Sequence, residues 1–460
     1  MSHLVILATI LALSLIGYRM GRGRALALAG GRTRDLHSLP SYYGGYVMLW
    51  CGLPASLLAG AWFAVEPTAV RWLVLYSLPA ALGDLPAERL GLVYNDIRNL
   101  ALGDAVAGTV DATIKAAAGR YLSLTQASVA VLAVTSLAAA GLGLWFGWRR
   151  VAPGFPARPA VEAGIRVILI VSSTLAIFTT VGIILSLLFE ALRFFEKVPF
   201  WEFLFGLEWS PQTALRADQV GASGSFGAVP IFAGTALISA IAMAVAVPIG
   251  LFSAIYLAEY ATKPVRDVAK PVLEILAGIP TVVYGFFAAL TVAPLIRDAG
   301  GEIGLSVASE SALAAGVVMG IMIVPFVSSL SDDVITAVPG SLREGSYALG
   351  ATRSETIRKV ILPAALPGIV ASVLLAVSRA IGETMIVVMA AGLAANLTAN
   401  PFQAVTTVTV QIVTLLVGDQ EFDSAKTLAA FALGLVLFVV TLGLNLVALA
   451  TVRKYREKYD

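Results

Sequence analysis

The chain has 460 residues, of which 58% are hydrophobic and 13% are charged, and its formal net charge is +2. A soluble protein of this length would carry about 25% charged residues, so the composition excludes an ordinary soluble domain. The small net charge gives no indication of a nucleic-acid partner. The single cysteine, Cys51, excludes an intrachain disulfide, and because it and the two histidines, His3 and His37, lie far from other ligand residues, no metal or cofactor site is predicted.

Apolar runs recur along the chain, and most reach about the 20 residues that a helix needs to cross a bilayer. We therefore predict an all-α polytopic membrane protein with about nine transmembrane helices. The apolar stretch Arg71–Leu82 is short and contains Pro79, so we interpret it as interfacial or re-entrant. The predicted spans are Leu4–Tyr18, Tyr43–Val65, Leu122–Trp148, Ile165–Phe189, Phe226–Leu257, Val272–Ile296, Ser311–Leu330, Leu366–Leu393 and Thr427–Thr451.

Lysine and arginine residues gather after the first, third, fifth, seventh and ninth predicted spans. With nine spans, all five basic segments lie on one side, which the positive-inside rule assigns to the cytoplasm. We therefore expect an external N-terminus and a cytoplasmic C-terminus. The first apolar run has no basic stretch before it and arginines after it, which favours a retained anchor over a cleaved signal peptide.

A basic, proline-rich stretch divides the chain at residues 149–163, which we interpret as a cytoplasmic linker. Residues 1–148 before it form a three-span membrane extension with a polar external loop. Residues 164–460 after it form a unit of six spans.

Gly278 and Pro280 interrupt the predicted sixth span. Glycine and proline loosen a helix and free a backbone carbonyl, which suits a gating bend. A packing kink would use the same residues, and the sequence does not distinguish the two.

The loop between the seventh and eighth predicted spans is long, from about Asp332 to Pro367. Ser341 is placed to cap a helix, with Glu344 completing a capping box. Small residues and a glycine at Gly350 predict two short helices with a turn between them. Such a helix pair can lie in a groove on a partner protein, where a glycine permits close approach.

The spacing in this loop resembles the coupling motif of ATP-binding-cassette importer permeases, which is Glu-Ala-Ala, three residues, Gly, nine residues, Ile, any residue, Leu-Pro. Val360 stands at the Ile position, and two small residues replace the alanines. The resemblance implies that the loop binds a separate ATPase; the alternative is an ordinary amphipathic helix pair. The matching positions are Glu344, Gly345, Ser346, Gly350, Leu362 and Pro363. The chain has no Gly-x-x-x-x-Gly-Lys-Ser/Thr segment, so we do not expect it to hydrolyse ATP.

Two charged residues, Arg379 and Glu383, fall inside the predicted eighth span. A charge there costs at least about 2.5–3.5 kcal/mol and usually marks a substrate path. Four positions apart on one helix, the two side chains face the same way and can pair. A guanidinium suits phosphate-like oxyanions, and the glutamate can hold the arginine or accept a hydrogen bond from a protonated oxyanion. Such a hydrogen bond would favour phosphate over sulfate, which carries no proton at neutral pH. The alternative is an ion pair that only fixes helix packing.

Three segments resemble the phosphate-specific importer permeases of the PstC type: Arg379–Met385, Phe226–Thr235 and Gly278–Gly285. With the loop motif, the resemblance covers about residues 160–452. It implies a six-helix importer permease core in a bacterial cytoplasmic membrane that moves inorganic phosphate inward, with Arg379, Glu383 and Thr384 on the substrate pathway. It also implies a second permease subunit, two copies of an ATPase and an external phosphate-binding protein. The N-terminal extension departs from the shortest members of the family, and no role is predicted for it.

Three alternative functions remain. The first is a permease that transports another oxyanion. A secondary transporter driven by an ion gradient would show inverted repeats and several charges within spans, whereas this sequence has one such pair and no evident repeat. A membrane-embedded enzyme would need a cluster of His, Cys, Asp or Glu residues at the bilayer face. We therefore predict a transport subunit and not an enzyme.

Overall fold

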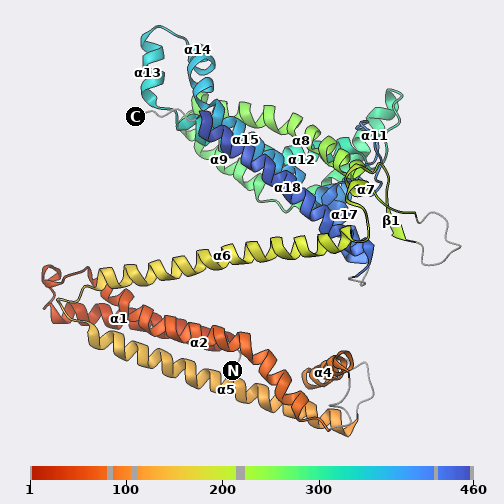
Figure 1. The fold of residues 1–460 in the computed structure, drawn as a ribbon. Helices are drawn as coiled ribbons and strands as arrows, with labels where there is room; N and C mark the ends of the chain where they lie inside the picture. The colour runs from red at the N-terminus through yellow and green to blue at the C-terminus, as the bar shows by residue number, and fades with distance from the viewer. Residues whose placement is uncertain (1–2, 80–85, 105–110, 214–222, 419–422, 456–460) are drawn as a thin grey trace. The chain divides into compact units, whose positions relative to one another are not determined.

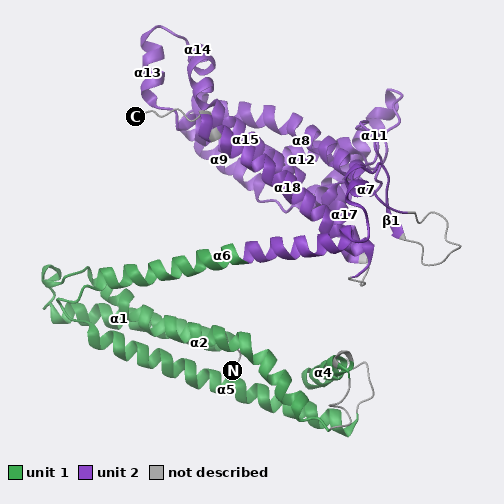
Figure 2. Cartoon of the chain, in the orientation of Figure 1, with its two compact units in different colours: residues 1–178 green, residues 179–460 purple. Residues whose placement is uncertain are grey.

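The computed structural model describes residues 3–79, 86–104, 111–213, 223–418 and 423–455. Two compact units divide the chain, residues 1–178 and 179–460 (Figure 2). Within the described residues, nine helices are long and apolar enough to cross a membrane. This result confirms the predicted all-α polytopic class.

The first unit is built on three long helices that lie side by side, α1 (His3–Leu28), α2 (Pro40–Tyr76) and α5 (Ala112–Arg150) (Figure 1). A 3₁₀ turn (Thr33–Asp35) follows α1, and α4 (Ala87–Leu102) packs on α5. The segment between α5 and α6 (Ala157–Phe195) is held by Tyr43, whose hydroxyl donates to the carbonyls of Pro153 and Phe155 at 3.0 Å.

The apolar stretch Arg71–Leu82 is not a separate interfacial or re-entrant element, contrary to the prediction. Residues 71–76 form the end of α2, and residues 80–82 lie outside the described part of the chain. Pro67 lies inside α2 without ending it, whereas the helix ends shortly before Pro79. A proline disfavours helical geometry in the residue before it, which accounts for this end point.

The second unit contains the remaining elements, with a small antiparallel hairpin as its only sheet among the described residues. In the hairpin, Trp209 pairs with Phe226 and Ser210 with Ser225. The elements in chain order are α7 (Phe200–Phe205), β1 (Trp209–Thr213), β2 (Ser223–Phe226), α8 (Val229–Ile255), a π-helical turn (Tyr256–Tyr260), α9 (Lys263–Ala277), α10 (Thr281–Phe287), a π-helical turn (Ala288–Val292), α11 (Ala293–Glu302), α12 (Ala312–Thr336), α13 (Gly340–Ala348), α14 (Arg353–Thr356), a π-helical turn (Ile357–Ile361), α15 (Leu362–Ile381), α16 (Met385–Ala390), α17 (Val408–Gly418) and α18 (Ala425–Tyr455).

Helix α12 is the centre of the second unit and packs along α8. Two glycines one turn apart bring these helices together. A Cβ atom at Gly316 would lie 2.6 Å from the Ile241 side chain, and one at Gly320 would lie 2.9 Å from the Ala242 carbonyl oxygen. Small residues four apart permit such close approach between membrane helices, which gain stability from van der Waals contact.

The bounds of the predicted sixth span, Val272–Ile296, are wrong. Helix α9 ends before Gly278, and the apolar helix of spanning length covers Thr281–Glu302. Charged residues recur along α9, as is typical of a helix at a membrane surface. Pro280 disfavours helical geometry at the residue before it, so the helix is interrupted there, where one continuous span was predicted.

Candidate functional site

The loop with the coupling motif forms two short helices, α13 and α14, that project from one end of the second unit (Figure 1). The predicted turn at Gly350 is confirmed, since this residue has φ +82°, a region that glycine enters without strain. The hydroxyls of Ser346 and Thr356 lie 2.9 Å apart and join the two helices. Gly350 therefore allows the chain to reverse while these small side chains close the pair.

The tip of this loop is exposed and partly apolar. Glu344 and Gly345 are exposed, Tyr347 is 42% exposed, and Leu349 is 90% exposed. An apolar tip beside a carboxylate is typical of a surface that another protein covers. Of the predicted coupling residues on α13, Glu344 and Gly345 thus lie on an exposed face, and Ser346 contacts α14.

The predicted capping box at Ser341 and Glu344 is wrong. Pro339 precedes the first residue of α13, so Ser341 lies inside the first turn and cannot cap it. The capping box belongs instead to α14, where the Glu355 amide donates to Thr352 Oγ1 at 3.3 Å and the Thr352 amide donates to Glu355 Oε2 at 3.0 Å.

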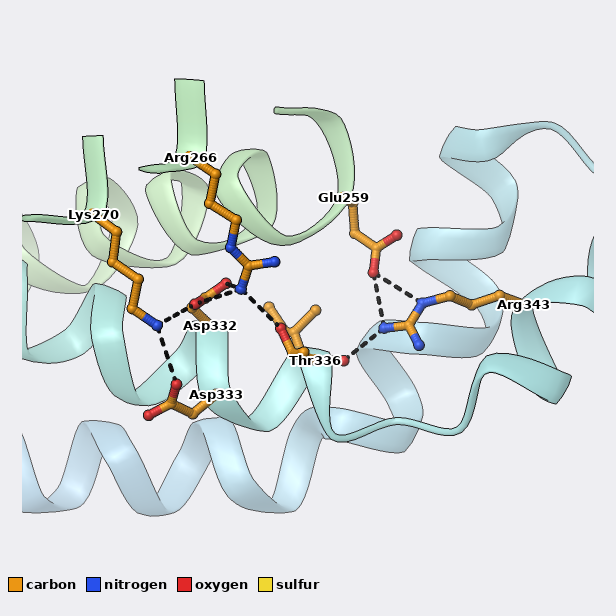
Figure 3. A network of polar contacts seen from close by, with 8 residues as sticks. Glu259, Arg266, Lys270, Asp332, Asp333, Thr336 and Arg343 are labelled. Carbon is orange, nitrogen blue, oxygen red and sulfur yellow. Dashed lines mark hydrogen bonds and ion pairs between the residues drawn. The ribbon is translucent and has the colours of Figure 1, made fainter. Parts of the chain in front are cut away.

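Arg343 of α13 lies in a buried polar cluster (Figure 3). Its Nε and Nη2 atoms donate to Glu259 Oε1 at 3.1 and 3.0 Å. The same guanidinium donates to the carbonyl of Val338 and, over 2.7 Å, to that of Ile335. One arginine therefore links α13 to the C-terminal end of α12 and to the π-helical turn that ends α8.

A second cluster surrounds Asp332 of α12 (Figure 3). Its carboxylate accepts from Arg266 Nη2 at 3.1 and 3.0 Å and from Lys270 Nζ at 2.9 Å. The Asp332 side chain is 2% exposed, and both cations are 32% exposed. The hydrogen bond to Asp332 raises the pKa of Lys270 above its ordinary value, so this lysine stays charged at neutral pH. A buried carboxylate needs such partners, and the cluster thereby holds α9 against α12.

Neither cluster was predicted from the sequence. The cations and acids lie more than 60 positions apart in the chain, so no local motif joins them. One signal was present: Arg266 and Lys270 are four apart on an amphipathic segment, and Asp332 ends an otherwise apolar run.

Gly278 and Pro280 lie in the break between α9 and α10, where the sequence predicted an interruption. The Tyr284 hydroxyl of α10 donates to the Leu276 carbonyl of α9 at 2.9 Å and bridges the break. The break therefore lies at the C-terminal end of α9, the helix whose Arg266 and Lys270 bind Asp332 of α12.

The predicted pairing of Arg379 with Glu383 is wrong, and so is the end of the eighth span at Leu393. Helix α15 ends at Ile381, so the two residues do not share a helix. Within the described chain no ion pair joins them: Glu383 Oε1 accepts from the Met385 amide at 3.1 Å, and Arg379 lies over the Phe326 ring at 5.8 Å.

The predicted pathway residues lie together at the end of α15. Arg379 occupies the last turn and is exposed, and its charge suits a helix C-terminus. Thr384 directly precedes α16, and its hydroxyl donates to the Gly382 carbonyl at 3.4 Å. Leu362 and Pro363 begin α15, so about 26 Å of continuous helix separates the loop from Arg379. Among the described residues, no group of three His, Cys, Asp or Glu side chains could hold a metal ion.

Two families match the chain. Residues 246–457 match the family described as the inner membrane component of binding-protein-dependent transport systems. Residues 7–179 match a family described as phosphate ATP-binding cassette transporter.

Curated relatives and a solved structure are also similar. The probable ABC transporter permease protein YqgH of Bacillus subtilis is 35% identical over 240 residues, which cover 52% of this chain and 74% of the relative. The phosphate transport system permease protein PstC 1 of Mycobacterium tuberculosis is 33% identical over 279 residues, covering 55% of this chain and 81% of the relative. A crystal structure of a bacterial alginate ABC transporter, in complex with an alginate pentasaccharide-bound periplasmic protein, has a TM-score of 0.45 at 16% identity and covers 65% of this chain and 98% of that chain.

The similarity to these two relatives extends over 74% and 81% of their length. The chain therefore belongs to the family of inner-membrane permeases of binding-protein-dependent ABC transporters, and within it to the PstC type.

Proposed function

We propose that this chain is the permease subunit of an ATP-driven importer that moves inorganic phosphate into the cytoplasm. Curated relatives named as phosphate transport system permeases support the substrate. The observation that carries the mechanism is the continuity of α15, which begins at the loop that carries the coupling motif and has Arg379 in its last turn. The chain is a transport component, and a partner subunit hydrolyses the ATP.

The α13–α14 loop is the surface that the ATPase binds. Its exposed face, with Glu344 and Gly345 beside the Leu349 tip, offers one carboxylate and an apolar contact to a groove on the partner. The basic helix α9 meets the same end of α12 through Asp332. Basic residues at this end favour a cytoplasmic location. Arg453 and Lys454 in the last turn of α18 favour the same side for the C-terminus.

Arg379 lines the phosphate pathway. An exposed guanidinium on a membrane helix is too costly to face lipid, so it requires a water-filled path or a partner subunit. Its neighbours Glu383 and Thr384 add an acceptor and a hydroxyl beyond the end of the helix. The fork of donors on the arginine matches the oxygens of phosphate.

The assembly that this role needs contains a second permease subunit, two copies of the ATPase and an external phosphate-binding protein. The break at Gly278 and Pro280 acts as the gating bend, since it separates α10 from α9, the helix that Arg266 and Lys270 join to α12. Within the chain, residues 164–460 form the permease domain, residues 149–163 link it to the N-terminal membrane unit at 1–148, and the whole lies in the bacterial inner membrane.

The test is uptake of labelled phosphate into proteoliposomes that contain the purified complex. We expect uptake only with internal ATPase subunit and ATP, and no comparable uptake of sulfate. Phosphate uptake by this chain alone, driven by a proton gradient, would identify a secondary transporter and refute the proposal. Equal uptake of sulfate would instead assign another oxyanion. Copurification followed by identification of the bound proteins tests the partner set independently.

A further inference from the structure

Arg343 directly precedes the exposed Glu344 but is itself partly buried. Its side chain is 20% exposed, and that of its partner Glu259 is 6% exposed. The other basic residues of the loop, Arg353, Arg358 and Lys359, are exposed. Arg343 is therefore the basic residue of α13 that reaches into the second unit, while its neighbour remains on the surface.

The contacts of Arg343 involve three separate elements. The guanidinium binds Glu259 through two nitrogens, which fixes its orientation more firmly than a single contact would. It also donates to the carbonyls of Ile335 and Val338, which lie at and just after the end of α12. Carbonyls at a helix end have no partner within the helix, and a cation there is favourable. Arg343 thus completes the end of α12 and binds the end of α8 at the same time.

Glu259 lies in a π-helical turn, Tyr256–Tyr260, that extends α8. Such turns are uncommon and are frequent at functional sites. Helices α8 and α12 pack along their length at Gly316 and Gly320, so they move together when one end is displaced. A displacement of α13 that carries Arg343 with it therefore acts on both helices of the core.

We propose that Arg343 is a positioning residue for ATP coupling, acting through Glu259 and the end of α12 to carry movement of α13 into α8 and α12. This inference rests on the proposed function, because α13 is displaced only if an ATPase binds it. It adds a second route to the one through α15: the start of α15 follows the loop along the chain, whereas Arg343 connects the loop to the core through side-chain contacts.

The first test measures the ratio of ATP hydrolysed to phosphate transported in proteoliposomes that contain the full complex. We expect Arg343→Met to raise this ratio about tenfold while the ATPase still copurifies, since coupling energies of this size are typical. Arg343→Lys keeps the charge but not the fork of donors, so we expect a ratio between those of the wild type and Arg343→Met. Lys263→Met removes an exposed cation from α9 and serves as the control, with an unchanged ratio. An unchanged ratio in both arginine variants would overturn the inference.

The second test separates a transmitting role from a merely structural one and does not depend on transport. In a Cys51→Ala background, one spin label is placed at Ser341 on α13 and, in a second protein, one at Tyr256 at the end of α8; both positions are exposed. In the wild type, both labels should change mobility when ATP is added to the complex. In Arg343→Lys and Arg343→Met, the label at Ser341 should still respond and the label at Tyr256 should not.

The outcomes distinguish the two proposals. If neither label responds in the wild type and no ATP-dependent uptake is found, the proposed function fails. If the wild type responds and the label at Tyr256 responds equally in the arginine variants, only the role of Arg343 is refuted. If the two labels lose their response together in Arg343→Lys, the arginine supports the fold and does not transmit movement, which also refutes the inference.

Discussion

We predict that replacing all three charged residues of the Asp332 cluster with apolar ones destabilises the chain less than replacing only the two cations. The carboxylate is 2% exposed and accepts three hydrogen bonds from Arg266 and Lys270. Replacing Lys270 with Met removes one charge-assisted hydrogen bond, which we expect to cost about 1.5–3 kcal/mol. Replacing both cations with Met leaves a buried carboxylate without a counter-charge, and the expected cost rises to about 3–5 kcal/mol.

The third variant adds Asp332→Leu to the two cation changes. Replacing a buried ion cluster with apolar residues of similar size is often close to neutral, so we expect most of the lost stability to return. The contact between Lys270 and Asp333 changes this prediction little, because Asp333 is 64% exposed and surface pairs contribute about 0–1 kcal/mol.

The assay is equilibrium unfolding of the purified chain in mixed micelles, followed by circular dichroism across a titration of denaturing detergent. Lys263→Met is the control, since a change at an exposed position should shift the free energy of unfolding by less than about 0.5 kcal/mol.

The raised pKa of Lys270 sets the pH range of the measurement. The stabilisation by Lys270 is complete below the ordinary lysine pKa and is lost as the pH rises through the pKa in the folded state. The measured differences should therefore be constant from about pH 6 to pH 9. A double variant that costs less than about 1 kcal/mol, or a triple variant as unstable as the double, would refute the reasoning.

Three further predictions concern the loop, the pathway and the core. Glu344→Lys reverses the charge on the exposed face of α13 and should release the ATPase from membranes in a sedimentation assay. The matched change Asp267→Lys, at an exposed position of α9, should not release it. Full retention of the ATPase by Glu344→Lys would count against the role of this face. Arg379→Gln should abolish phosphate uptake while the ATPase still copurifies. Arg379→Lys should retain part of the uptake, since lysine keeps the charge without the fork of hydrogen-bond donors. Normal uptake in Arg379→Gln would contradict a role for this residue in the pathway. Gly320→Leu brings side-chain atoms against the Ala242 carbonyl, and this overpacking should lower the free energy of unfolding by about 1–3 kcal/mol or more. Gly301→Leu, at a site open to solvent, should change the free energy of unfolding much less. Equal effects of the two variants would contradict the close packing of α8 and α12.

The class of fold could be predicted from the sequence because hydrophobic length is a local property. Each apolar run shows its own capacity to cross a bilayer, so the nine helices of spanning length among the described residues could be predicted from composition along the chain. The ends of those helices did not follow, because they depend on single residues. Gly382 ends α15 before Glu383, and this one position removed the predicted pair with Arg379. Ser341 is two residues too late to cap α13, whereas Thr352 caps α14.

The candidate site could be predicted where it depends on spacing and not where it depends on tertiary contacts. The turn at Gly350 and the break at Gly278 follow from the residues themselves, because glycine and proline restrict or free the backbone locally. The partners of Arg343 and Asp332 could not be predicted in this way. Glu259 precedes Arg343 by 84 positions, and only the packing of α8 against α12 brings them together.

The π-helical turn at Ile357–Ile361 has a consequence for how the length of this chain can vary. A π-helical turn holds one residue more than an α-helical turn. Deleting one residue there would restore an ordinary turn and leave Leu362, Pro363 and the rest of α15 facing their present neighbours. The same deletion inside α12 would rotate every later residue by about 100° and turn Asp332 away from its cations. Single-residue gaps between relatives are therefore expected at Ile357–Ile361, between the loop and the helix it adjoins, and not within α12.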